Sequence, residues 1–191
     1  MAASALDTAL RAIWMAAGIV WLVAAVAVKR AARREAAGSR IGHLLTMAAA
    51  FGMVFSPALR PGPLGWRAIP ASAPAATVAL ALTSAGVLLA IWARLYLGGN
   101  WSAIVAVKQG HTLVRSGPYR IVRHPIYTGL LAALAGTAIG YGHVGGLVAV
   151  AVAFAAWMAK ARLEEQFLTA EFGAAYGAYQ REVKTLIPFV L

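Results

Sequence analysis

The chain of 191 residues is 61% hydrophobic and only 12% charged, and its mean hydropathy of +0.73 excludes an ordinary soluble domain. A net charge of +11 suits nucleic acid, but the basic residues lie between apolar runs, so we expect a membrane protein and no nucleic-acid partner. The absence of cysteine excludes disulfides, thiolate catalysis and Cys-based metal sites.

Three long apolar runs fill the first half of the chain. Residues Leu10–Val28, Ile41–Leu59 and Ala75–Leu97 are each long enough to cross a hydrocarbon layer of about 30 Å as a helix. Four prolines between the second and third runs predict an irregular connection. Gly98 and Gly99 end the third run.

The second half contains two shorter apolar runs and a polar tail. A polar stretch leads to Pro125, which suits the first turn of a helix, so we expect spans at about Pro125–Gly140 and Val144–Met158. The glycine-rich turn between them predicts an antiparallel hairpin. From Lys160 to Pro188, apolar residues at helical spacing predict an amphipathic helix: Leu168, Phe172, Tyr176, Tyr179 and Val183.

These elements predict an all-α integral membrane protein with about five transmembrane helices in one domain, residues 1–191. Residues 1–99 would form a three-span scaffold, and residues 100–191 the functional half. With the amino terminus outside, the segments on the cytoplasmic side hold five, four and four basic residues, and the outer segments hold only three. This bias places the carboxyl terminus and the segment before Pro125 in the cytoplasm. The alanine- and arginine-rich composition favours a bacterial cell membrane.

Polar chemistry is concentrated between Leu113 and Tyr127, and again at Glu164 and Glu165. His124 and Tyr127 flank the start of a helix whose amino end favours an anion, so both can line a pocket at the membrane surface. The alternative is that this segment only anchors a span at the lipid headgroups.

The two glutamates also admit two interpretations. Lys160 lies four residues before Glu164, and Arg162 lies three before Glu165, which is the spacing of helix-surface ion pairs. Alternatively, a carboxylate holds a ribose hydroxyl or a cationic cofactor, while a basic residue holds an anionic substrate. No cluster in the sequence has metal-ligand spacing. The glycines at 140, 142 and 145 lack the preceding strand that a dinucleotide-binding motif needs.

The carboxyl-terminal half resembles the isoprenylcysteine carboxyl methyltransferases and, more broadly, the superfamily that includes membrane phospholipid N-methyltransferases. The resemblance lies in residues 110–129, 164–179 and 187–189, which read GHTLVRSGPYRIVRHPIYTG, EEQFLTAEFGAAYGAY and IPF. The paired motifs, in this order around a helical hairpin, are specific. The first three runs match only in being hydrophobic.

This resemblance implies that S-adenosylmethionine binds in a cytosolic pocket capped by the tail, and that a lipid-like or prenylated acceptor arrives from the bilayer. Matching the family's cofactor contacts residue by residue gives His111, Thr112, Leu113, Val114, Tyr119, His124, Pro125, Ile126, Tyr127 and Glu164. The family's carboxyl methyltransferases carry an arginine four residues before that glutamate, whereas this chain has Lys160 there and Arg162 two residues later. We therefore expect Lys160, Arg162 and Glu165 to serve the acceptor and the chemistry.

The sequence leaves the acceptor open. A carboxylate is already nucleophilic and needs positioning more than a base. An amine or thiol must lose a proton, for which Glu164, Glu165 or His124 is available. An NADPH-dependent sterol-type reductase and a non-catalytic membrane scaffold are the competing interpretations.

Overall fold

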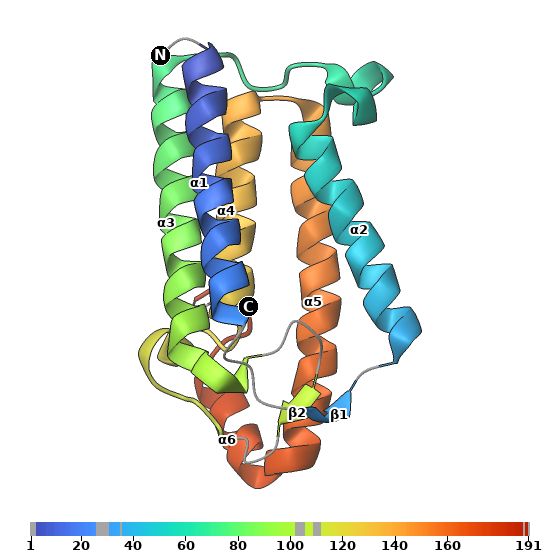
Figure 1. Ribbon diagram of the computed structural model, residues 1–191, viewed down its shortest axis with the longest axis vertical. Helices are drawn as coiled ribbons and strands as arrows, with labels where there is room; N and C mark the ends of the chain where they lie inside the picture. The colour runs from blue at the N-terminus through green and yellow to red at the C-terminus, as the bar shows by residue number, and fades with distance from the viewer. Residues whose placement is uncertain are drawn as a thin grey trace.

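The computed structural model describes residues 3–25, 31–34, 36–101, 106–108, 112–188 and 190. Five long helices run along the molecule: α1 (Ala3–Ala25), α2 (Ala37–Phe55), α3 (Ala73–Leu97), α4 (Pro125–Tyr141) and α5 (Val144–Phe172). In Figure 1, α1, α3 and α4 stand side by side, and α5 and α2 form the other side of the bundle. The turn between α4 and α5 forms the predicted hairpin, with Gly142 at a left-handed φ of 71°.

Each of the five apolar runs corresponds to a helix, but α1 begins seven residues before the predicted Leu10 and α5 extends well beyond the predicted Met158. Within the described residues, three helices are long and apolar enough to cross a membrane: α1 through its segment Ser4–Ala24, α3 and α5. α4 has only 17 residues, and α2 carries Arg40 and His43 near its start. The chain is therefore a helical integral membrane protein.

The α3–α4 interface depends on small residues. A Cβ added at Gly86 would lie 2.5 Å from the backbone of Ala133, and one added at Gly129 would lie 2.5 Å from the carbonyl oxygen of Gly86. Helices in lipid commonly associate through such close backbone contacts, because burying apolar side chains contributes little to helix association there. The two helices also share the hydrogen-bonded hydroxyls of Thr83 and Thr137, 3.3 Å apart.

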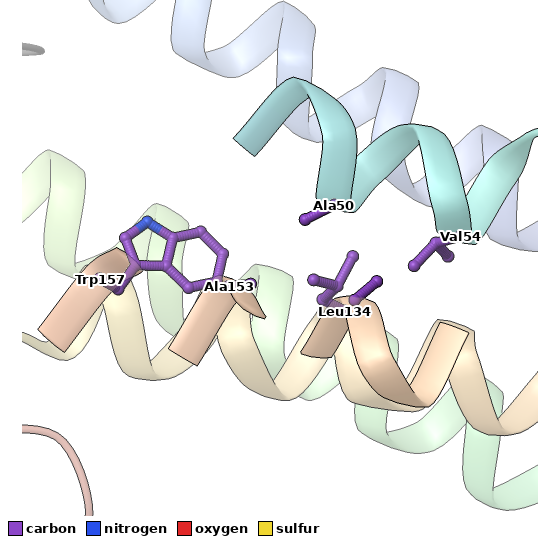
Figure 2. Close-up of a cluster of buried hydrophobic side chains, with 6 residues drawn as sticks. Ala50, Val54, Leu134, Ala153 and Trp157 are labelled. Atoms are coloured by element: carbon purple, nitrogen blue, oxygen red, sulfur yellow. The ribbon is translucent and has the colours of Figure 1, made fainter. Parts of the chain in front are cut away.

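A second cluster joins α2, α4 and α5. Figure 2 shows Ala50 and Val54 of α2 against Leu134 of α4, with Ala153 and Trp157 of α5 alongside. Trp157 is the large residue of this cluster, and it continues the packing toward the end of α5 that carries the two glutamates.

One prediction about local structure is wrong. α5 does not stop near Met158 but continues to Phe172, because residues 159–172 contain no glycine or proline; the helix breaks at Gly173, where φ is 51°. The separate tail helix is therefore only α6 (Ala174–Glu182). The all-α class is confirmed, with one small addition that was not predicted: β1 (Ala31–Arg34) and β2 (Ala106–Lys108) pair as a short antiparallel ribbon. In Figure 1 this ribbon lies at one end of the bundle, where β2 contacts α5.

Candidate functional site

The site is built at the end of the bundle where α5 projects beyond a lipid core. With 29 residues, α5 is about 43 Å long at 1.5 Å per residue, compared with about 30 Å of hydrocarbon. Lys160 and the glutamates at 164 and 165 lie in the projecting part. The amino end of α4 faces this part, since His124 precedes α4 and contacts both glutamates.

His124 lies between the two carboxylates. Its Nδ1 is 3.3 Å from Glu164 Oε2, and its Nε2 is 3.2 Å from Glu165 Oε1. The imidazole is buried, at 6% exposure, whereas the side chains of Glu164 and Glu165 are 23% and 14% exposed. His124 therefore meets two glutamates about 40 positions away in the sequence, and the three side chains form one buried polar cluster.

The charge state of His124 follows from these contacts. Burial by itself favours the neutral ring and lowers the pKa, but the hydrogen bonds and charges of Glu164 and Glu165 outweigh it, so the pKa of His124 is raised above its ordinary value. The ring is consequently a cation between two carboxylates over a wider pH range than a free histidine.

Tyr127 completes this cluster, which we call the His124 cluster: His124, Tyr127, Glu164 and Glu165. The Tyr127 hydroxyl donates to Glu164 Oε1 at 2.5 Å. Its ring is stacked between His124, with centroids 5.6 Å apart, and Trp157, at 6.3 Å. These separations are typical of offset aromatic pairs, so the ring orientation is fixed by packing from both sides.

Arg123 ties the carboxyl-terminal segment to the cluster. Its Nε donates to Glu165 Oε1 at 2.8 Å, one Nη donates to the carbonyls of Gln180 and Val183, and the other donates to Thr185 Oγ1 at 2.7 Å. The backbone adds hydrogen bonds from Arg123 N to Lys184 O and from His124 N to Thr185 O. Residues 183–185 therefore lie along the segment 122–124, next to the His124 cluster.

The remaining sequence-predicted cofactor residues lie in different surroundings. Tyr119, Pro125 and Ile126 are buried, and Val114 packs with Tyr119 and Ile126 against Ala93. The Tyr119 hydroxyl donates to the carbonyl of Ala93, and burial raises the pKa of this phenol. Leu113 is half-buried and Thr112 is exposed, while His111 lies outside the described residues. For all six described positions, the cofactor contact stays a prediction.

Lys160 and Arg162 differ in exposure. Lys160 is half-buried one helical turn before Glu164, whereas Arg162 is exposed. Arg162 lines a hollow of about 470 Å³ between α5 and α6, together with Glu165, Gln166, Thr169, Ala170 and Gln180. Glu165 belongs both to the lining of this hollow and to the His124 cluster.

Sequence reasoning missed two parts of this arrangement. It treated Arg123 as a possible headgroup anchor, although the arginine fork binds four groups from α5 and the tail. It also gave Trp157 no role beyond its apolar run. The apolar, aromatic character of residue 157 was visible, but its contact with Tyr127 depends on the α4–α5 crossing, which no local pattern reveals.

The chain is similar to known proteins. The chain is 33% identical over 117 residues to the protein-S-isoprenylcysteine O-methyltransferase of Schizosaccharomyces pombe, a match that covers 60% of this chain and 50% of that protein. It is 32% identical over 114 residues to the cobalt-zinc-cadmium resistance protein CzcN of Cupriavidus metallidurans, covering 57% and 49%. The structure of the eukaryotic intramembrane Ras methyltransferase (isoprenylcysteine carboxyl methyltransferase) superimposes with a TM-score of 0.51 at 28% identity, over 83% of this chain and 55% of that one. The chain thus spans about half the length of these relatives.

The fold and the site define a helical integral membrane protein whose longest helix carries a buried, charged cluster where it leaves the bilayer. The family model described as phospholipid methyltransferase matches residues 75–175, which are more than half of the chain and include His124, Tyr127 and both glutamates. The chain therefore belongs to the phospholipid methyltransferase family, and the resemblance to isoprenylcysteine methyltransferases is confirmed.

Proposed function

We propose that this protein transfers a methyl group from S-adenosylmethionine to a lipid-like or isoprenoid acceptor, most simply a carboxylate. The observation that carries the proposal is the His124 cluster, which brings together the side chains of two separate family motifs. The names of two of the three relatives described above support it, since these two are isoprenylcysteine methyltransferases.

The chemistry of the cluster suits this cofactor. The side chain of Glu164 is 23% exposed, so its carboxylate can accept hydrogen bonds from ribose hydroxyls or from an ammonium group. α4 begins without a side-chain cap, so its amino end favours a carboxylate such as that of the cofactor. S-adenosylmethionine supplies an activated sulfonium methyl. The side chains therefore need to orient the reactants and exclude water more than to activate a nucleophile.

For the acceptor, we assign the binding of an anionic group to Lys160 and Arg162. Both lie on the α5 segment that leaves the membrane, beside the glutamates. With its anionic group bound there, the acceptor extends its acyl or prenyl chain into the bilayer, toward the apolar part of α5. Glu165, held by Arg123 and His124, borders the hollow that Arg162 lines, which places a carboxylate beside the proposed acceptor site.

A second candidate acceptor is the amine of a phospholipid headgroup, because the matching family model is that of phospholipid methyltransferases. An amine must lose a proton before or during transfer, and the glutamates of the cluster are the nearest bases to receive it. We further propose that the His124 cluster faces the cytoplasm and that the amino terminus lies outside, because the basic segments gather at this end of the chain's helices.

The test is calorimetric titration of the purified protein with S-adenosylmethionine. We expect binding to the wild type and a loss of at least tenfold in affinity for Glu164→Gln. Glu171→Gln is the matched control, because Glu171 is an exposed glutamate of the same helix. Absence of binding to the wild type, or equal binding to both variants, contradicts the proposal.

The acceptor is identified by incubating membranes with the methyl-labelled cofactor and extracting the lipids. Label that mild base releases marks a methyl ester and supports a carboxylate acceptor. Label that resists base and stays with a phospholipid headgroup marks N-methylation and supports the second candidate.

A further inference from the structure

A group of cations lies at the opposite end of the bundle from the His124 cluster. The connection from α2 to α3 contains the 3-10 turns η1 (Pro57–Leu59) and η2 (Gly62–Gly65) and folds over the α4–α5 turn. Backbone hydrogen bonds from Ala68 and Ile69 to Gly142 O, and from Val144 to Trp66 O, hold it there. This connection brings Arg60 and Arg67 beside His143, the residue that precedes α5.

Arg60 lies against the amino end of α5. A Cβ added at Gly145, in the first turn, would come within 2.9 Å of Arg60 Cγ. The first turn of α5 contains no acidic residue, and its capping position is His143, whose side chain makes no cap. A helix amino end carries a partial positive charge and favours an anion nearby. Arg60 instead brings a second positive charge to this end of α5.

Nothing in the described part of the chain compensates these charges. Arg60 Nη1 is buried and has no hydrogen-bond partner there. Among the described residues, Arg67 donates to a backbone carbonyl, that of Ile69, at 3.2 Å. Asp7, the acidic residue that contacts Tyr141 at the end of α4, is occupied by Arg11 and by the Tyr141 hydroxyl. A buried guanidinium atom without a partner indicates a missing acceptor.

The surroundings identify the kind of acceptor. Trp66, 68% exposed, and Leu59, 50% exposed, flank the two arginines on the same connection. Exposed tryptophan beside arginine at the end of membrane-spanning helices is typical of the headgroup region, where phosphate is the abundant anion. Burial, together with Arg60 and Arg67, lowers the pKa of His143, and its Nδ1 donates to the carbonyl oxygen of Gly65 at 2.9 Å. The ring therefore does not supply the missing acceptor, and the two arginines are the groups that would bind it.

We propose that Arg60, Arg67 and the amino end of α5 bind the phosphate of an anionic membrane lipid. The bound phosphate supplies the charge that the first turn of α5 lacks and holds the α2–α3 connection against the α4–α5 turn. This site is separate from the His124 cluster and does not rest on the proposed methyl transfer.

The experiment measures thermal unfolding in neutral detergent with added phosphatidylglycerol, phosphatidylcholine or soluble glycerol phosphate, and counts bound lipid by native mass spectrometry. We expect phosphatidylglycerol to raise the unfolding temperature of the wild type by about 5 °C at a hundredfold excess over its dissociation constant. Arg60→Gln should lose this rise and the bound lipid. Arg181→Gln, which removes one exposed charge on α6 at the other end, should keep both.

A second variant covers the case in which Arg60→Gln does not fold. His143→Asp places a carboxylate at the capping position of α5, among the cations, and aspartate is a preferred capping residue. We expect this variant to unfold at a higher temperature without added lipid and to respond less to phosphatidylglycerol. An equal rise with glycerol phosphate overturns the lipid assignment, and a rise that both variants retain in full overturns the site.

Discussion

At the α3–α4 interface, backbone lies against backbone across Gly86 and Gly129, whereas at the α5–tail junction, charge lies against charge around Arg123. The first interface is within the bundle and uses small residues and two threonine hydroxyls. The second is beyond the lipid core and uses an arginine, two glutamates and a histidine, all more than three-quarters buried. Close packing can tolerate no added volume, and a buried ion network can tolerate no lost partner.

This difference separates scaffold from site. The α3–α4 contact fixes the position of α4, and therefore of His124 at its start. The network then fixes the side chains that face the cofactor and the carboxyl-terminal segment that lies over them. A change in either region should affect the His124 cluster, but by different mechanisms and to different extents.

Removing Arg123 should have the largest effect. Arg123→Met removes the arginine partner of Glu165, leaving His124 as its cation, and leaves the carbonyls of Gln180 and Val183 without this donor. Breaking such a buried pair costs about 3–5 kcal/mol. We expect unfolding at a much lower temperature, with early loss of the tail as measured by proteolysis after residue 173. Arg123→Lys should recover only part of the stability, because an ammonium cannot replace the fork.

The matched control is Arg115→Met. Arg115 also pairs with a glutamate of the tail region, Glu182, but these side chains are 39% and 64% exposed. An exposed pair contributes about 0–1 kcal/mol, so this variant should unfold almost as the wild type does. Equal destabilisation of the two variants would show that burial of the network around Arg123 is unimportant.

Filling the α3–α4 contact should have a smaller effect. Gly129→Ala adds a Cβ that would lie 2.7 Å from the backbone nitrogen of Ala90, and overpacking of this kind costs about 1–3 kcal/mol. Gly18→Ala is the control, since an added Cβ there meets nothing within 4 Å. The measurement is the unfolding temperature of each variant in detergent. An unchanged unfolding temperature for Gly129→Ala would mean that α3 and α4 can move apart without loss of stability.

These two regions also differ in how far the sequence predicted them. The apolar runs, Pro125 at the start of α4 and the glycine-rich turn are local signals, so the helices and the hairpin were predicted, although the start of α1 and the end of α5 were not. The meeting of His124 with Glu164 and Glu165 was expected only from paired family motifs, because no local pattern brings residues 40 positions apart together. The continuous α5 was missed because the change from apolar to charged residues at Lys160 suggested a new helix. A membrane helix that leaves the bilayer changes its surroundings without breaking its backbone.

The smallest expected effect is a pH dependence confined to the charged junction. Since the folded-state pKa of His124 is raised above its ordinary value of about 6.5, its contribution to stability is complete below that value and is lost as pH rises through the folded pKa. In that window the free energy of unfolding should fall by up to about 1.4 kcal/mol per pH unit. His143, whose pKa is lowered, gives the opposite trend at lower pH, so the difference between wild type and His124→Gln isolates the effect. Thermal unfolding between pH 5.5 and 9 measures it, and a difference that grows with rising pH would contradict the proposed charge state and show that the α5–tail junction is held by the arginine alone.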